Sequence, residues 1–233
     1  MTEYKIVNLS AMLEELGEDA VKAILSDFSC PLNPDVEFFL SKKAISFARQ
    51  GSAQTHLAFA WHKEKWTLVG YFALANKHMR IPITTLGRSG SKLRSRIKWF
   101  ATYDNESRCY ILSAPLIAQL GKNFTNGYNE LITGDELLSE ACRKICKIQL
   151  ELGGKFAYLE CEDKPKLKRF YSRNGFLEFD KRMLDKDETD KLDGSYLVQM
   201  LKYISKKDCL YTNSRSICSG SFLTLWACQS PLP

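Results

Sequence analysis

The stretch Leu167–Phe179 reads LKRFYSRNGFLEF and predicts a short basic helix that ends near Gly175 and runs directly into an apolar strand. A glycine just past a helix end supplies the left-handed backbone conformation that such a reversal needs. Tyr171 falls on the last turn of this helix, where its phenol can face a cleft. The alternative is that Tyr171 and Phe176 are core aromatics that close an ordinary helix–strand unit.

The composition is ordinary for a globular protein. The 233 residues are 45% hydrophobic and 26% charged, and this length suits one sizeable domain or two small ones. No stretch reaches the roughly 18 apolar residues that a membrane-spanning helix needs. The amino-terminal stretch MTEYKIVNLSAMLEELGEDA carries acidic side chains early and contains no signal-peptide core. We therefore expect a cytoplasmic protein.

The eight cysteines are expected to be reduced thiols, because the chain is long and apolar enough to fold without disulfide bonds. Cys142 and Cys146 lie four residues apart on an expected helix with no histidine nearby. Buried helix-face cysteines are therefore favoured over a zinc site. His56, His62 and His78 gather around one expected hairpin, but their spacing does not indicate metal ligation, and we expect no metal site.

The net charge of +6 is mildly basic, and its distribution is more informative. Met79–Tyr103 contains six cationic side chains and no acidic one. This stretch belongs to residues 77–107, which we interpret as a Ser-rich insertion or lid, with a short helix at Lys92–Phe100, rather than as core. Over an acceptor cleft it would suit an acidic or phosphorylated partner; otherwise it is a solvated loop. Only Trp99 and Phe100 interleave with the cations, so a dedicated nucleic-acid surface is not indicated.

Hydrophobic periodicity and turn signals predict alternating strands and helices over residues 1–204. The expected strands are Tyr4–Leu9, His56–His62, Trp66–Leu74, Arg108–Leu120, Phe156–Cys161, Phe176–Met183 and Ser195–Ile204. The expected helices cover residues 11–16, 19–28, 34–50, 92–100, 134–152 and 166–173. This order predicts a mixed α/β sheet with a parallel middle, because strand–helix–strand crossovers need parallel pairing. Residues 205–233, rich in Ser and Cys, form a tail to which we assign no function.

The strand Arg108–Leu120 contains Pro115, which removes a ladder donor, so we expect pairing to break there and the strand to bulge or splay. Thr133 and Glu136 form a capping box that starts the next helix. Open sheets bind ligands where the carboxyl end of a strand meets the amino end of a helix. We therefore expect a ligand at Ala114–Glu136, where helix N–H groups suit a pyrophosphate.

The FYxxxGF motif at Phe170–Phe176, preceded by a splayed strand and a helix, resembles the GNAT superfamily of N-acetyltransferases. The order and spacing of elements match this family from about Tyr4 to Ile204, and the overlap is strongest over Arg108–Met183. The resemblance implies a GNAT-like acyl-CoA N-acyltransferase fold, with central splayed strands and helices on both faces of the sheet. It also implies an enzyme that moves an acetyl group from acetyl-CoA directly to a primary amine.

The resemblance assigns roles to residues of this chain. Tyr171 would be the general acid that protonates the departing coenzyme A thiolate. Glu160 and Glu162 lie on one face of the expected strand beside the splay, and they are the candidate general bases; the alternative is that both are surface acids. The candidate coenzyme A contacts are Leu116, Ile117, Ala118, Lys122, Ile132, Thr133, Gly134, Asp135 and Lys164.

Two features depart from the family pattern. The family's phosphate loop usually reads Q/R-x-x-G-x-G/A, and the corresponding residues here are Asn129, Ile132 and Gly134, of which only Gly134 fits. Asp135 also brings negative charge close to the expected phosphate, as does the glutamate after it. At position 164 the family often has Asn, where this chain has Lys164.

Three functions remain open at this stage. The first is an acetyl-CoA-dependent N-acetyltransferase that acts on a small amine or a peptide amine. The second is the same chemistry on aminoacyl-tRNA, as in the toxin members of the superfamily, with the basic insertion holding RNA. The third is a catalytically silent acyl-CoA-binding module, which the eroded loop motif favours and Tyr171 opposes.

Overall fold

The computed structural model describes residues 4–185, 194–205 and 208–209. The expected tail beyond residue 209 lies outside this part of the chain, so nothing tests that assignment. The described residues fall into two compact units. Unit 1 comprises residues 4–74 and 119–141, and unit 2 comprises residues 75–118 and 142–209.

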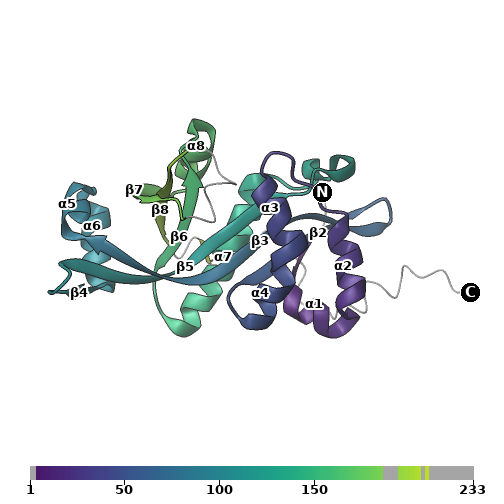
Figure 1. Ribbon diagram of the computed structural model, residues 1–233, viewed down its shortest axis with the longest axis horizontal. Helices are drawn as coiled ribbons and strands as arrows, with labels where there is room; N and C mark the ends of the chain where they lie inside the picture. The colour runs from purple at the N-terminus through teal and green to yellow at the C-terminus, as the bar shows by residue number, and fades with distance from the viewer. Residues whose placement is uncertain (1–3, 186–193, 206–207, 210–233) are drawn as a thin grey trace, which may run out of the picture. The chain divides into compact units, whose positions relative to one another are not determined.

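Hydrogen-bonded strands follow the order β1-β2-β3-β5-β6-β8-β7, and β4 pairs with β5 (Figure 1). The sheet is mixed, as the sequence predicts. The pairs β1–β2, β2–β3, β4–β5, β6–β8 and β7–β8 are antiparallel, whereas β5–β6 is parallel. The strands are β1 (Tyr4–Asn8), β2 (Gln54–His62), β3 (Lys65–Pro82), β4 (Thr102–Asp104), β5 (Cys109–Lys122), β6 (Phe156–Glu162), β7 (Leu177–Met183) and β8 (Tyr196–Tyr203).

Helices connect these strands along the chain (Figure 1). They are α1 (Leu9–Leu16), α2 (Glu18–Ser26), α3 (Pro34–Phe38), the π turn η1 (Phe39–Lys43), α4 (Ala44–Gln50), α5 (Ile83–Arg88), α6 (Ser91–Phe100), the 3₁₀ turn η2 (Thr125–Glu130), α7 (Gly134–Leu152) and α8 (Pro165–Arg173). The expected helix over residues 34–50 is thus present as α3, η1 and α4 in succession. No helix in the described residues is long and apolar enough to cross a membrane.

The core of unit 1 contains Tyr71 of β3, which is fully buried. Its hydroxyl donates to the carbonyl oxygen of Val36 at 2.6 Å, and its ring packs edge-on against Phe28 at 5.2 Å. Gly121, at the end of β5, approaches this core so closely that a Cβ there would lie 2.3 Å from Val36 Cγ1. A glycine is therefore needed where β5 enters the loop before α7.

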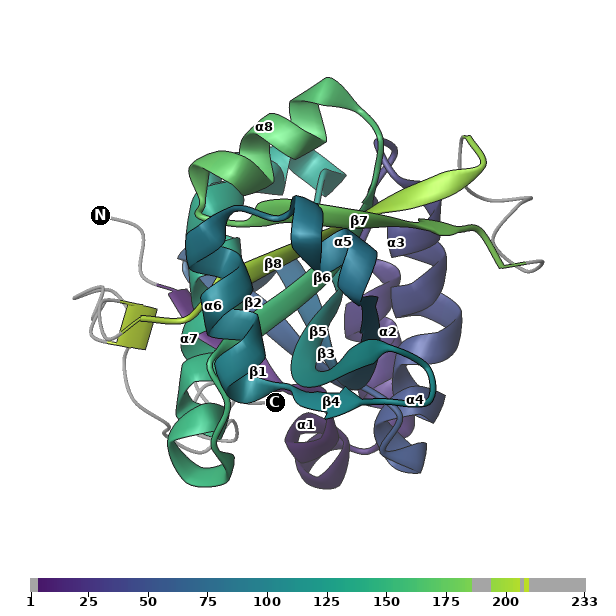
Figure 2. The same ribbon diagram turned by 90° about the vertical axis from the view of Figure 1, so that its left-hand side faces the viewer.

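The core of unit 2 corrects the interpretation of residues 77–107 as an insertion outside the core. β3 continues to Pro82, with Met79 and Ile81 buried in alternation. Leu93 and Ile97 of α6 are buried in one cluster with residues of β5, β6 and β8. Figure 2 looks onto α5 and α6, which lie over these strands. The basic stretch is therefore anchored by its apolar residues rather than being a loose lid.

The sequence also predicts that pairing of β5 breaks at Pro115. In the described residues the parallel ladder between β5 and β6 contains only the pairs Leu116–Tyr158 and Ile117–Leu159. β5 itself runs on to Lys122. The strands thus separate after Ile117, as the splay requires, although the pairing begins just after the proline rather than ending at it.

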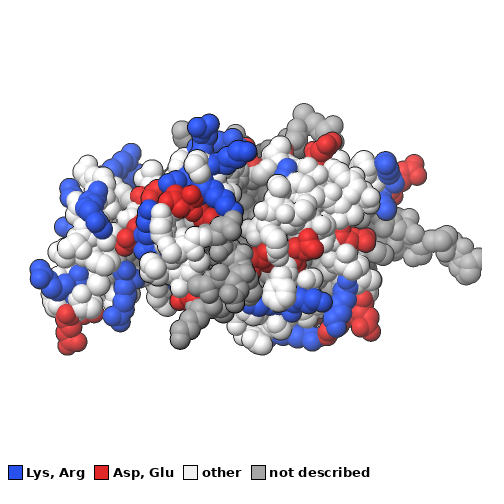
Figure 3. All heavy atoms as spheres, turned by 45° about the horizontal axis from the view of Figure 1, so that its top comes forward, with Lys and Arg blue, Asp and Glu red and all other residues white. Residues whose placement is uncertain are grey.

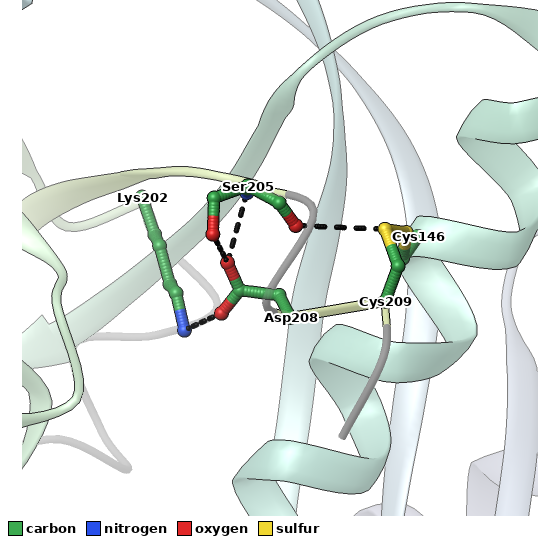
Figure 4. Close-up of a disulfide and its surroundings, with 5 residues drawn as sticks. All are labelled: Cys146, Lys202, Ser205, Asp208 and Cys209. Carbon is green, nitrogen blue, oxygen red and sulfur yellow. Dashed lines mark hydrogen bonds and ion pairs between the residues drawn. A yellow bond between two sulfur atoms is a disulfide. The ribbon is translucent and has the colours of Figure 1, made fainter. Parts of the chain in front are cut away.

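The cysteine expectation is wrong for one pair. Cys146 of α7 and Cys209 form a disulfide bond, with their Cα atoms 5.6 Å apart (Figure 4). Beside it, the Asp208 carboxylate accepts from Lys202 Nζ at 2.6 Å and from the Ser205 hydroxyl at 2.7 Å. Cys209 lies in the Ser- and Cys-rich segment after the last strand, and its partner could not be identified from the spacing alone.

Reduction of this disulfide is expected to lower the free energy of unfolding by about 2–4 kcal/mol, because the cross-link closes a loop of 63 residues and removes conformational entropy from the unfolded chain. The measurement is thermal unfolding of the protein with and without dithiothreitol. The Cys209→Ser variant should unfold at the temperature of the reduced protein and should not respond to the reductant. Equal unfolding temperatures of the oxidised and reduced wild type would contradict this prediction.

Candidate active site

Tyr171 lies in the last turn of α8, as the sequence predicts. The helix ends because Gly175 adopts φ +85°, and the amide of Phe176 donates back to the Tyr171 carbonyl at 3.1 Å. The phenol ring packs between Phe170 and Phe176, with ring centroids 4.9 and 6.0 Å away. These contacts fix the ring at the end of the helix.

The protonation state of Tyr171 suits a general acid. Burial raises the pKa of its phenol well above the ordinary value, and the neighbouring Cys161 adds to this shift. No described residue exchanges a hydrogen bond with its hydroxyl. The group therefore keeps its proton near neutral pH, and its O–H has no protein partner in the described structure.

Glu160 of β6 is held in a network that the sequence did not reveal. Its carboxylate accepts from Arg182 Nε at 3.1 Å and from a second guanidinium nitrogen at 2.8 Å, and it also bonds to the Tyr158 hydroxyl. Gln199 Nε2 donates to the Tyr158 hydroxyl at 2.7 Å and to Glu160 at 3.2 Å. The side chains of Glu160 and Arg182 are 11% and 22% exposed, so the pair is largely withdrawn from water.

This network determines what Glu160 can do. Burial alone would raise the pKa of its carboxyl, but the hydrogen bonds from Arg182, Tyr158 and Gln199 outweigh burial and hold the pKa below its usual range. Burial, followed by the charge of Glu160, raises the pKa of Tyr158 well above that of an ordinary phenol. A carboxylate bound in this way is a weak proton acceptor, so the geometry favours a positioning role for Glu160.

Glu162 lies two residues further along β6, on the same face of the strand as Glu160. Its carboxylate pairs with Lys164 Nζ at 2.9 Å, and the Lys164 side chain is 48% exposed. The structure therefore brings together two predicted site residues, one a candidate base and the other a candidate phosphate contact. Lys164 also occupies the position just before α8.

The predicted thioester contacts lie where β5 leaves β6. Leu116 and Ile117 make the described parallel pairs, and Ala118 follows the end of that ladder. Ile117 is buried, whereas Leu116 and Ala118 are partly exposed. The chain thus presents strand backbone at a point where its neighbouring strand has departed, which is the arrangement that a ligand amide can complete.

The predicted phosphate loop lies in unit 1, and its capping box is confirmed. Thr133 Oγ1 accepts from the Glu136 amide at 3.1 Å, while the Thr133 amide donates to the Glu136 carboxylate at 2.9 Å. The Thr133 N–H is therefore already bonded. Gly134 and Asp135 open α7, where the first N–H groups have no partner within the helix.

The other two loop candidates have structural contacts. Lys122 Nζ donates to the Asn129 carbonyl at 2.8 Å, so this lysine connects the end of β5 to the loop that follows it. Ile132 is 1% exposed, so its side chain is buried and does not face a ligand. Among the described residues, no three His, Cys, Asp or Glu side chains gather closely enough to hold a metal ion.

We compared the chain with protein-family models, curated proteins and solved structures. No protein-family model matches the chain, and no curated protein matches it. Among solved structures, a mutant of the toxin AtaT bound to the C-terminus of the antitoxin AtaR and acetyl-CoA aligns over 91% of this chain and 99% of that chain, with TM-score 0.54 and 13% identity.

Two further solved structures agree with this alignment. A mutant of the toxin KacT aligns over 88% of this chain and 97% of that chain, with TM-score 0.56 and 14% identity. AtaT complexed with acetyl-methionyl-tRNAfMet aligns over 84% and 94%, with TM-score 0.55 and 13% identity. The chain therefore shares the fold of these toxin structures, which confirms the GNAT-like fold that the FYxxxGF resemblance implied.

Proposed function

We propose that this protein is an acetyl-CoA-dependent N-acetyltransferase that transfers the acetyl group directly to a primary amine. The observation that carries the proposal is Tyr171, a protonated phenol without a described hydrogen-bond partner at the end of α8, in a fold shared with a structure solved with acetyl-CoA. The cytoplasmic location expected from the amino-terminal sequence remains part of this proposal.

In this proposal, acetyl-CoA would contact two stretches of the chain. The pantetheine arm carries amides, and the backbone at Leu116, Ile117 and Ala118 lies where the ladder with β6 ends. Backbone N–H groups of these residues would orient the thioester carbonyl and stabilise the negative charge that develops on its oxygen. Acetyl-CoA supplies the activated acetyl group.

The pyrophosphate would be held by the loop and the first turn of α7. The N–H groups of Gly134 and Asp135 and the positive end of the helix dipole favour an anion there. Ile132 and Thr133 would position this turn rather than bind phosphate directly, since the Thr133 N–H already donates to the Glu136 carboxylate. Lys122 and Lys164 are the candidate cations, and each would exchange its present protein partner for phosphate.

Proton transfer is divided between two side chains in this proposal. Glu162 accepts the proton of the attacking amine, directly or through water, because it lies on the same face of β6 as Glu160 and its ion-pair partner Lys164 is half-exposed. Glu160 is the alternative base, but its bonds to Arg182 fit a role in fixing β6 beside the splay. Tyr171 then donates its proton to the departing thiolate.

The acceptor is the least defined part of the proposal. A small amine or a peptide amine is the simplest acceptor for this chemistry. The amino group of an aminoacyl-tRNA is a second candidate, favoured by the likeness to AtaT, which has been solved with acetyl-methionyl-tRNAfMet. A catalytically silent acyl-CoA-binding module is the remaining alternative, but it assigns no proton-transfer role to Tyr171.

Binding of acetyl-CoA is tested by thermal unfolding. At a concentration of about 100 times its dissociation constant, acetyl-CoA is expected to stabilise the protein by about 2.7 kcal/mol, because it binds the folded state alone. An unrelated nucleotide such as GTP serves as the control and should leave the unfolding temperature unchanged. If millimolar acetyl-CoA produces no shift, the loop does not bind the pyrophosphate and the proposed enzyme function fails.

A further inference from the structure

The outward face of α6 combines positive charge with one large aromatic side chain. Lys92 and Trp99 lie two helical turns apart, about 10 Å along the axis, and Ser95 lies between them. Lys98 flanks Trp99 on the same solvent-facing side, opposite the buried Leu93 and Ile97. We call Lys92, Lys98 and Trp99 the α6 surface.

Trp99 is unusually exposed for its type. Its side chain is 84% accessible, whereas tryptophan is on average among the more buried residues. The helix does not need it for packing, because Leu93 and Ile97 already anchor α6 in the unit 2 core. A large, flat, amphipathic ring held outward on an anchored helix is a feature of recognition surfaces.

The cations around Trp99 form no close ion pairs in the described residues, and Arg80 alone has a nearby acid that the described interactions record, Asp104. In the described residues, none of the six cations between Met79 and Tyr103 forms an ion pair. Arg96 stacks its guanidinium over the Tyr203 ring at 4.0 Å, and Lys98 Nζ lies 6.0 Å from the Tyr110 ring. Figure 3 shows Lys and Arg spread over the part of unit 2 where Figure 1 has α5, α6 and β4, with acidic groups at its lower edge and along its border with the centre of the picture.

We propose that the α6 surface binds a single-stranded nucleic acid, with Trp99 stacking on a base and Lys92 and Lys98 contacting the neighbouring phosphates. Aromatic side chains that alternate with cations are the means by which proteins hold single strands, because every base has a stacking face and every nucleotide a negative charge. An acidic protein would satisfy the lysines but gives no reason for the outward tryptophan. This inference goes beyond the proposed acetyl transfer and does not depend on it.

The structure thereby changes what the sequence indicated. From the sequence, two aromatics among six cations were too few for a nucleic-acid surface. In the structure, Phe100 is 39% exposed and contacts the rings of Phe156 and Tyr203, so it belongs partly to the core. One exposed aromatic is enough for one stacked base when the lysines beside it fix the backbone.

The test measures binding of the full chain to labelled single-stranded homopolymers of about ten nucleotides, oligo(rA) and oligo(dA), by fluorescence anisotropy at several salt concentrations. We expect binding that weakens as salt rises. The Trp99→Ala variant should bind about 5- to 100-fold more weakly. The double variant Lys92→Gln, Lys98→Gln should lower the salt slope by about 1.4, or about 0.7 for each lost phosphate contact.

Matched controls separate this surface from general charge effects. Trp61→Ala removes a tryptophan that is 41% exposed on β2 of unit 1. The double variant Lys42→Gln, Lys65→Gln removes two exposed lysines of unit 1. Both controls should bind as the wild type does. Tighter binding of oligo(rA) than of oligo(dA) would support the proposal and identify RNA as the ligand, and equal binding would support a strand of either kind.

Three outcomes would overturn the proposal. They are no binding of either oligonucleotide at low salt, unchanged binding by Trp99→Ala, and equally tight binding of a polyglutamate peptide. The unfolding temperature with acetyl-CoA is measured on the same variants. Since the α6 surface shares no residue with the acetyl-CoA contacts, that shift should persist in every variant, so the two proposals fail independently.

Discussion

The Tyr171→Phe substitution is expected to lower kcat for acetyl transfer about 10- to 1000-fold, while the stabilisation by acetyl-CoA stays unchanged. The substitution removes only a hydroxyl, and the ring keeps its contacts with Phe170 and Phe176. Since that hydroxyl bonds to no described residue, its removal leaves no partner unsatisfied, and folding should be unaffected. The measurement is turnover of an amine acceptor together with thermal unfolding in the presence of acetyl-CoA.

The pH dependence adds a second reading of the same residue. Because burial raises the pKa of Tyr171, the phenol remains protonated until the pH exceeds its ordinary value of about 10. On the basic side of the pH profile, kcat of the wild type should therefore not begin to fall below about pH 10, because the general acid keeps its proton. Tyr103→Phe, a change at an exposed tyrosine of β4, is the matched control and should retain full activity. Full activity of Tyr171→Phe would remove the general-acid role.

Local sequence signals predicted much of the backbone structure around Tyr171. The reversal after Tyr171 depends on Gly175, and its φ of +85° is the conformation that a glycine after a helix end predicts. Pro115 predicted a break in strand pairing, because a missing N–H is a property of the residue itself, although the short parallel ladder begins just after the proline and the strands separate after Ile117. The Thr133 capping box was likewise complete within four consecutive residues.

Features that depend on distant residues were missed. Glu160 was a candidate base because its strand face was predictable, but its partner Arg182 lies on β7, and β7 is reached only through β8. No local pattern gives that register. The disulfide of Cys209 was missed for the same reason, since its partner lies 63 residues earlier in the chain. The extension of β3 beyond Leu74 was also missed, but a local pattern does indicate it, because Met79 and Ile81 alternate with polar residues.

The Arg182→Ala substitution is expected to destabilise the protein by about 3–4 kcal/mol at pH 7, because it leaves the largely buried Glu160 carboxylate without its cation. Tyr158 and Gln199 would still donate to Glu160, which keeps the cost from being larger. The measurement is urea unfolding. Lys181→Ala, at the neighbouring but exposed lysine, should leave the free energy of unfolding nearly unchanged, since exposed ion pairs contribute little.

The sign of the pH effect distinguishes this ion pair from simple loss of packing. In the wild type the pKa of Glu160 is lowered, so the pair contributes its stability above the unfolded value near 4.5, and this stability is lost as the pH falls through the folded pKa. Without Arg182, burial would raise the pKa of Glu160, and the variant would lose stability as the pH rises. The difference between wild type and Arg182→Ala should therefore be largest near pH 7 and shrink toward pH 4. If the difference in unfolding free energy between wild type and Arg182→Ala does not change with pH, Arg182 acts through its packing. The ion pair would then not be what holds Glu160 in its positioning role.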